Sequence, residues 1–533
     1  MDASYNVEFF TKDEELVLLR YFTNVDKPVF GLINLPEVVK SALYARYSRS
    51  NKSLRRLFLD EFYTKDSNVS LDISIHNTNK ADKLFERVFV EYGDDSVAQL
   101  GGAHLACEQA SNILAKVLER GRIAAYLEQS TRYVYYNQKV NDKYNYLIPF
   151  EIQQSELREE YNGCVDNLFD TYSEIVDKLL PILREKFPQS DALNNRAWEN
   201  TLKAKACDIV RGLLPASTRT NIGIFASGQA YELLLLRMFA STNKEVLQYA
   251  TMMLEELRKI IPSFLKRVDL EDRGKVVSRY LHDINSKMEN LNLKATHNNY
   301  SSVVNSQVEL LDWDKDAIDK VLVSALYENS EVSENDLILY CESLNYEQKR
   351  SILEAYVGNR SNRRHKPGRA FERTYYRFDI LSDYGAFRDL QRHRMLTIQW
   401  QKLSPYNGYA ISEELLEFDE LQLLFNSAVQ KAGALYDKLV LSVGPEIAQY
   451  VVPFAYNIRY SLQFNLREAF HLIELRTQKQ GHPSYRKVCI DMYNLIEDTA
   501  AHGILLKSMK FVDFSFHELS REDSEKRMDQ KTI

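Results

Sequence analysis

Glycine and proline are scarce in this sequence, with 18 and 12 residues among 533. Long flexible linkers, which depend on such residues, are therefore not expected. The five cysteines are scattered and form no C-x-x-C pair, which argues against a disulfide framework or a zinc knuckle. No run approaches 18 consecutive apolar residues, and the acidic N-terminus has no apolar signal core. We therefore expect a soluble cytoplasmic protein without a membrane partner.

The common phosphate and metal motifs are also missing. The sequence has no G-x-x-x-x-G-K-[ST], no G-x-G-x-x-G and no H-E-x-x-H, so no standard phosphate loop and no metal site is predicted. The net charge of −7 gives the whole protein no attraction to nucleic acid. An anion site must instead be a local basic cluster.

What is present is ordinary globular composition, with 45% hydrophobic and 27% charged residues. Apolar residues recurring at i, i+3, i+4 and i+7 predict helices over Gly101–Arg120, Val246–Ile261 and Leu462–Leu475. Short apolar or alternating runs predict strands at Leu16–Phe22, Val303–Leu311 and Tyr375–Leu381. The class is α+β, with helices in the majority.

The weakest patterning lies around Asn285–Ser302, the best candidate linker. It predicts a first domain over 1–285, a linker over 286–302 and a second domain over 303–533. Each piece contains R-x-R, at Arg120–Arg122 and Arg392–Arg394, and then a proline-marked turn and a helix ending in Leu-Arg. The spacings from that proline to the arginine are 22 and 23 residues. The shared order indicates a tandem duplication.

Two basic clusters could bind a phosphate. The segment from Arg120 to Tyr133 holds arginines and the Ser130 hydroxyl, which suit the oxygens of a phosphate monoester. Arg388 and Arg392 share a helix face, close to the basic segment Arg360–Arg369. For both, the alternative is a solvated basic surface or a charged helix end.

A third cluster follows a predicted helix through Asn465, Arg467, His471 and Arg476. The eleven-residue spacing puts Asn465 and Arg476 on nearly one face. The stripe could face a ligand, or His471 could be a satisfied structural histidine.

At these residues the chain resembles the flavin-dependent thymidylate synthases, whose signature reads R-H-R-x-x-S and then E-x-S-x-R-Y. Arg392–Thr397 in the second piece is similar to the first half, with Thr for Ser, and Glu128–Tyr133 in the first piece matches the second half. The family's last helix is similar to the stretch with Asn465, Arg467, His471, Leu475 and Arg476, and its arginine before a proline is similar to Arg211 before Pro215. Its F-E-H turn resembles Phe371–Arg373, and its A-R-x-S resembles Ala45–Ser48.

Each piece departs from the family where the other keeps it. In the first piece, Gly121 replaces the His of the signature and Ala125 replaces its Ser. Ala226 and Gly228 stand where the last helix of the family has Asn and Arg. In the second piece, Trp400, Lys402 and Ser404 replace the Glu, Ser and Arg of E-x-S-x-R, and Gln449 replaces the arginine before Pro453. The family shares each active site between subunits, so the resemblance implies one nearly complete composite site from unlike pieces and one degenerate site. The resemblance also implies two copies of a domain with helices packed on a central, antiparallel-rich sheet.

The resemblance further implies an enzyme that methylates dUMP to dTMP. Methylenetetrahydrofolate would give the carbon, and FAD, reduced by NADPH, would give the hydride. By the same resemblance Arg476 is catalytic and faces the uracil. The dUMP-binding residues would be Glu128, Ser130, Arg132, Tyr133, Arg211, Arg392 and Arg476. The FAD-binding residues would be Ser48, Glu372, Arg392, His393, Arg394, Asn465, Arg467 and His471.

Asp389 stands where the family usually has Gln, and an anion there could alter the accepted base. The family tetramer implies a homodimer of this double-length chain. The alternative is a flavin- or nucleotide-binding paralogue that has lost or changed the reaction.

Overall fold

The computed structural model describes residues 8–26, 30–37, 39–40, 43–44, 52–63, 99–132, 134–139, 142–189, 194–295, 307–515 and 518–519. The chain divides into two compact units. Unit 1 comprises Met1–Glu108, Ile123–Glu128 and Asn221–Tyr300. Unit 2 comprises Gln109–Arg122, Gln129–Thr220 and Ser301–Ile533. Each unit therefore draws on more than one stretch of the sequence.

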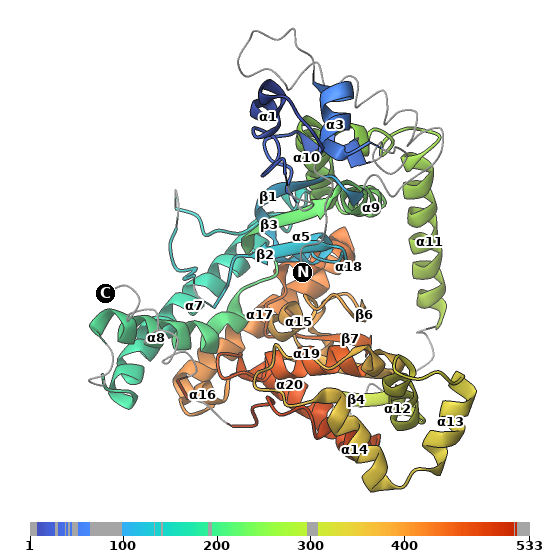
Figure 1. Ribbon diagram of the computed structural model, residues 1–533. Helices are drawn as coiled ribbons and strands as arrows, with labels where there is room; N and C mark the ends of the chain where they lie inside the picture. Colours follow the sequence, from blue (N-terminus) through green and yellow to red (C-terminus); the bar gives the residue numbers. More distant parts are fainter. Residues whose placement is uncertain are drawn as a thin grey trace. The chain divides into compact units, whose positions relative to one another are not determined.

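Unit 1 is built around a three-stranded sheet of order β1-β3-β2 (Figure 1). Strand β2 (Ala124–Glu128) runs antiparallel to β3 (Arg219–Ser227), with Ala124 opposite Ala226. Strand β1 is Gly102–Ser111. The described helices of this unit are α1 (Lys12–Leu18), α3 (Leu54–Leu57), η1 (Phe58–Phe62), α9 (Gly228–Phe239), α10 (Lys244–Ile260), η5 (Pro262–Leu265) and α11 (Gly274–Ala295).

Unit 2 contains a four-stranded sheet of order β4-β5-β7-β6. Its strands are β4 (Val308–Trp313), β5 (Tyr376–Asp383), β6 (Thr397–Trp400) and β7 (Asn457–Phe464), and neighbouring strands are antiparallel. Helices before the sheet in the chain are α5 (Asn112–Leu118), α6 (Phe150–Gln153), α7 (Arg158–Lys186), α8 (Asn195–Val210) and η4 (Arg211–Leu213). The helices and helical turns within and after it are α12 (Ala317–Tyr327), α13 (Glu334–Ser343), α14 (Tyr346–Val357), η6 (Arg369–Arg373), α15 (Tyr384–Leu390), η7 (Pro405–Asn407), α16 (Glu413–Leu416), α17 (Asp419–Val443), α18 (Pro445–Ala448), η8 (Gln449–Val451), α19 (Leu466–Arg476), α20 (Pro483–Asn494), η9 (Leu495–Thr499) and α21 (Gly503–Leu506).

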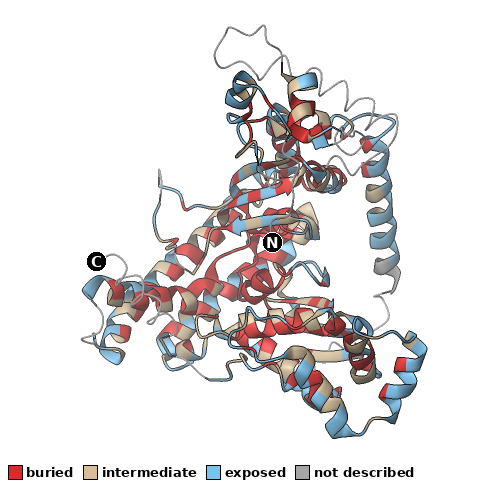
Figure 2. Cartoon of the chain, in the orientation of Figure 1, coloured by how far each residue is buried: buried red, intermediate tan, exposed pale blue. Residues whose placement is uncertain are grey.

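One contiguous hydrophobic core fills unit 2, and its residues come from α7, α17, the sheet and the helices that follow it. Figure 2 shows this interior as buried residues of the long helices and of α15 and α19. The long helices α7 and α17 pack on one another, which joins the two sequence pieces within one core. Among the described residues, no helix is long and apolar enough to cross a bilayer.

The two pieces repeat one topology. The order β1-β3-β2 equals the order β5-β7-β6, and each first strand leads directly into a short helix, α5 or α15. Within unit 2 the two proline turns also pair with each other. Pro215 bridges Pro453, and Ala216 N–H donates to the Val452 carbonyl at 2.9 Å. The repeated strand order supports the duplication that the sequence indicates.

The structure confirms the α+β class, the helix at Val246–Ile261 as α10, and the strand at Tyr375–Leu381 as β5. Three other predictions were wrong in part or whole. Leu16–Phe22 is no strand. A capping box between Thr11 and Glu14 starts helix α1, which runs to Leu18, and the residues after it form a turn that ends in a single bridge between Phe22 and Leu32. The stretches Gly101–Arg120 and Leu462–Leu475 each begin as a strand.

In those two stretches a polar cap decides where the helix begins. Ser111 accepts from the Leu114 N–H and starts α5, and Asn465 accepts from the Glu468 N–H and starts α19. Strand β4 begins at Val308, and residues 303–306 lie outside the described residues. Helix α11 continues to Ala295 and 296–306 are not described, so the domain boundaries at 285 and 303 stay a prediction.

Candidate functional site

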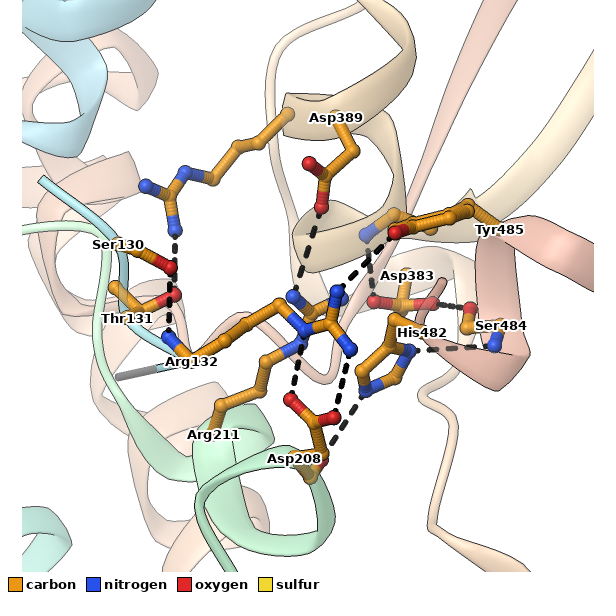
Figure 3. Close-up of polar contacts among 12 residues, drawn as sticks. Ser130, Thr131, Arg132, Asp208, Arg211, Asp383, Asp389, His482, Ser484 and Tyr485 are labelled. Atoms are coloured by element: carbon orange, nitrogen blue, oxygen red, sulfur yellow. Dashed lines mark hydrogen bonds and ion pairs between the residues drawn. The ribbon is translucent and has the colours of Figure 1, made fainter. Parts of the chain in front are cut away.

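Arginines and aspartates from both sequence pieces converge inside unit 2 (Figure 3). Arg132 donates from Nε and Nη2 to the two carboxylate oxygens of Asp208, each at 2.7 Å, and from Nη1 to the Tyr485 hydroxyl at 3.2 Å. Its backbone N–H donates to Ser130 Oγ at 3.2 Å. Burial alone lowers the pKa of Arg132, but Asp208 outweighs that effect and the pKa rises. The bidentate pair fixes the plane of the guanidinium.

Arg211, on η4, is buried and lies beside α15. Its Nη1 is 3.6 Å from Asp389 Oδ2, and its buried Nη2 has no hydrogen-bond partner among the described residues. A Cβ on Gly385 would lie only 3.1 Å from that Nη2 and 2.9 Å from Asp383 Oδ1, so glycine permits the close approach. Burial lowers the pKa of Arg211, yet guanidinium stays charged in proteins. A buried cationic donor without a partner is a position where an acceptor on a ligand could bind.

Asp389 is the acid at the centre of the cluster. It pairs with Arg392 Nη2, with Arg476 Nη1 at 3.4 Å and with Arg211. Burial alone raises the pKa of Asp389, but Arg392, Arg476, Arg211 and Arg132 outweigh burial and hold that pKa well below its usual range. The carboxylate therefore stays ionised at physiological pH. Four arginines, Arg132, Arg211, Arg392 and Arg476, therefore surround Asp389 and Asp208.

Arg476 ends helix α19, and its guanidinium is fixed from two sides. Its Nε donates to His393 Nε2 at 2.8 Å, and its Nη2 donates to the Asp389 carbonyl at 2.5 Å. The guanidinium also lies 5.5 Å from the centre of the Tyr485 ring. Tyr485 thus contacts both Arg132 and Arg476, which come from different sequence pieces.

The residues expected to bind flavin surround the start of α19. Glu372 accepts from Arg467 Nη1 at 3.0 Å and from Arg369 Nη2 at 3.0 Å, and Arg467 Nε donates to the Pro367 carbonyl. Asn465 uses its side-chain oxygen to cap the helix. These contacts show Glu372, Arg467 and Asn465 supporting the local fold, whatever else they bind.

A positively charged surface lies next to His471. Arg394, Arg363 and Lys366, together with Arg476, lower the pKa of His471, although burial is the largest cause and brings it to about 4. Among the described residues, Arg363, Lys366 and Arg394 have no carboxylate partner within 4.0 Å. These three cations could receive an anionic group.

The structure brings together Arg132, Arg211, Arg392, His393 and Arg476 around Asp389 and Tyr485. Glu128 ends β2 in unit 1, and Ser48 and Tyr133 lie outside the described residues. Sequence reasoning missed five polar residues of the cluster: Asp208, Asp383, Glu468, His482 and Tyr485. Asp208 lies three residues before Arg211 in the sequence, yet its carboxylate pairs with Arg132, so the i, i+3 spacing is no signal for that contact.

Two of the missed residues are hydrogen-bonded behind the arginines. Asp383 caps α15 through the Ala386 N–H and accepts from the Ser484 hydroxyl; burial raises its pKa. His482 contacts the Asp208 carbonyl through Nε2 at 3.1 Å, and burial lowers its pKa to about 3. Both residues tie α20 to the arginine cluster.

Comparison with known proteins gives a family match over most of the chain. The family model described as thymidylate synthase complementing protein matches residues 39–263 and again 309–500. The two matched segments lie on either side of the predicted linker. One family model matching twice agrees with the duplicated topology.

Two relatives match this chain over nearly their full length. A "UPF0159 protein" of Chlamydia muridarum (strain MoPn / Nigg) is 38% identical over 524 residues, covering 97% of this chain and 98% of its own. A "UPF0159 protein Ta1429" of Thermoplasma acidophilum is 30% identical over 92% of this chain and 99% of its own. A protein of Clostridium tetani (strain Massachusetts / E88) named flavin-dependent thymidylate synthase is 28% identical over 37% of this chain and 73% of its own.

Proposed function

The chain belongs to the thymidylate synthase complementing protein family, and from that premise we propose that it methylates dUMP to dTMP in one composite site per chain. The carbon would come from methylenetetrahydrofolate. The products would be dTMP and tetrahydrofolate, with the C5 proton of the pyrimidine released.

The observation that carries this proposal is the arginine cluster of unit 2. Arg211 keeps one buried donor without a partner among the described residues, and Arg132, Arg392 and Arg476 place three more guanidinium groups around Asp208 and Asp389. A phosphate monoester carries about −1.5 to −2 charges at neutral pH and accepts bidentate arginine donors. Arg132, Arg211 and the Ser130 hydroxyl would hold the phosphate and sugar of dUMP.

Arg476 would act on the base. As C5 of the pyrimidine becomes nucleophilic, negative charge develops on the ring, and a preoriented guanidinium stabilises it. The contacts of Arg476 with His393 and Asp389 hold the cation in place before substrate arrives. No rearrangement is then needed when the charge forms.

The residues present also fit an FAD pyrophosphate. Arg394, Arg363 and Lys366 are cations without a carboxylate within 4.0 Å among the residues that the structure describes, and they would pair with the phosphate oxygens. Arg392 and His393 would contact the flavin, with Asn465, Arg467, Glu372 and His471 supporting it. When bound, reduced flavin supplies the hydride, and NADPH renews it.

The degenerate positions agree with one site per chain. Gln449, which replaces the second piece's arginine before Pro453, is buried and accepts from the Leu403 N–H at 2.9 Å. It serves the local fold. We propose a homodimer with two composite sites, equivalent to the family tetramer.

A second candidate is a flavin- or nucleotide-binding paralogue with a changed or lost reaction. Asp389 favours it, because an ionised carboxylate among the arginines would meet the base where the family usually has an amide. A pyrimidine with an extra donor would suit that carboxylate better than uracil.

Two measurements test the proposal. The expressed chain should rescue a thymidine auxotroph, and the purified protein should be yellow with one FAD per chain. Failure to rescue despite good expression and bound FAD would favour the paralogue. Two FAD per chain would contradict the single composite site.

A further inference from the structure

Behind Arg476 runs a line of buried side chains whose last member the proposed reaction does not use. Glu468 Oε1 lies 3.1 Å from His393 Nδ1, and His393 Nε2 lies 2.8 Å from Arg476 Nε. The side chains of His393 and Glu468 are only 3% and 6% exposed. The carboxyl, the imidazole and the guanidinium thus form one hydrogen-bonded row.

The chemistry of the three groups fixes where the protons are. A guanidinium nitrogen can only donate, so His393 Nε2 must accept and carries a lone pair. The ring proton is therefore on Nδ1, and that N–H donates to Glu468. Burial, and then Arg476 and His471, lower the pKa of His393 well below its ordinary value, which agrees with a neutral ring.

Asp389 holds the same guanidinium on its other edge. Through contacts to His393 and Asp389, three of the five N–H donors of Arg476 are engaged. The other two N–H donors of Arg476 have no acceptor among the residues that the structure describes. The orientation of those two donors depends on how firmly His393 holds Nε.

We propose that Glu468 is a positioning residue, which holds His393 in the Nδ1–H tautomer and thereby aims Arg476 at its ligand. The inference rests on the proposed function only in taking that ligand to be the pyrimidine. Glu468 itself reaches the site only through His393.

The hold on Arg476 should depend on pH. Burial raises the pKa of Glu468 to about 7, with Lys366 and Arg467 opposing it. Above that pH the carboxylate accepts the Nδ1–H bond with its full charge, and such bonds are about twice as strong as neutral ones. Below it the neutral acid accepts weakly. The charged and titratable groups around the row include Arg363, Lys366, Asp389, Arg392, His393, Arg394, Arg467, His471 and Arg476, together with Tyr485 and Cys489 of α20, which face Arg476.

The same residues could instead form a metal site. Ligand atoms of His393, Glu468 and His471 lie within 4.8 Å of one another, and two histidines with a glutamate are a zinc-type donor set. His393 Nε2 already accepts a hydrogen bond from Arg476. The positive charges of Lys366, Arg363, Arg476 and Arg394 lower the pKa of His471. This positive surrounding opposes a cation, so we assign the row to proton positioning.

The first test determines which ring nitrogen of His393 carries the proton, and it needs no activity measurement. In histidine-¹⁵N-labelled full-length protein, magic-angle-spinning NMR should show His393, assigned by its loss in His393→Asn, with a protonated Nδ1 and a bare Nε2. Its nitrogen shifts should titrate with a midpoint near pH 7. That midpoint should disappear in Glu468→Gln, whose amide oxygen keeps the hydrogen bond without the charge.

The matched control is Glu446→Gln, which makes the same change in unit 2 at a half-exposed carboxylate paired with Lys402. It should leave the His393 titration unchanged. A proton on Nε2, or an unaltered midpoint in Glu468→Gln, would overturn the assignment. So would stoichiometric zinc in the purified protein that is lost in Glu468→Gln and His471→Asn.

The second test reads turnover. Glu468→Gln should lower kcat for dUMP about fivefold to tenfold above pH 7, the difference between charged and neutral hydrogen bonds, with little change in KM. The variant should also lose the fall in kcat that wild type shows below pH 7. An unchanged kcat–pH profile would contradict the positioning role. Wild type without any turnover, but with the predicted NMR titration, would reject the proposed reaction and retain the tautomer assignment.

Discussion

Replacing Arg476 by alanine is expected to lower kcat for dUMP methylation by about 10²–10³-fold, the cost of removing one preorganised donor to a developing charge. The reason is geometric. His393 and Asp389 hold the guanidinium in place, with contacts at 2.8 and 2.5 Å, so its charge is available without reorganisation. Arg476→Lys should recover little, because an ammonium cannot keep both contacts. Steady-state kinetics with purified, FAD-loaded enzyme measures the effect.

The matched control is Arg237→Ala. Arg237 stands at the end of α9, the position in the first piece that corresponds to Arg476, and it is exposed. If only one composite site per chain functions, this variant should keep wild-type kcat and dUMP binding. Equal losses in both variants would refute the asymmetry between the sequence pieces.

Arg132 gives an internal comparison, because it is assigned to the phosphate rather than the base. Arg132→Ala should raise KM for dUMP more than it lowers kcat, while also leaving Asp208, only 9% exposed, without its partner. Arg132→Ala with Asp208→Ala removes that secondary penalty. The double variant then reports the loss of phosphate binding alone.

The fold class and the duplication could be predicted from sequence because they depend on patterns repeated over many residues. Helix α10 follows an uninterrupted apolar period. The starts of α5 and α19 could not be placed, because an apolar strand that leads into an apolar helix has no break in hydrophobicity. There the single side chains of Ser111 and Asn465 decide the change.

The cations of the site could be predicted because a family signature marks them. Their polar partners could not, because each contact joins residues far apart in the sequence and forms only on folding. Asp208 pairs with Arg132, Asp383 accepts from Ser484, and Glu468 contacts His393. For the basic segment Arg360–Arg369, composition indicates an anion site or a solvated face for every cation alike. Arg360 departs from both, because it is buried in an ion pair, whereas Arg363 and Lys366 stay candidates for the anion site.

Breaking the ion pair between Arg360 and Glu474 is expected to destabilise unit 2 strongly. Arg360 donates from Nη1 and Nη2 to Glu474 at 2.7 and 2.6 Å and from Nη1 to the Ser508 carbonyl, and both side chains are 2% exposed. Phe470 and Phe511 flank the guanidinium, with ring centres 5.0 and 5.2 Å away. Glu474→Gln should reduce the free energy of unfolding by about 3–5 kcal/mol, because it leaves a buried charge uncompensated.

Tryptophan fluorescence can follow this loss, since Trp198, Trp313 and Trp400 all lie in unit 2. The urea midpoint should fall sharply in Glu474→Gln and little in Glu354→Gln, a similar change in an exposed pair with Arg350. Replacing both partners, as Arg360→Met with Glu474→Leu, removes both charges and should restore much of the stability. A double variant as unstable as Glu474→Gln would mean that Ser508 and the flanking rings, rather than the charge pair, set the requirement for Arg360.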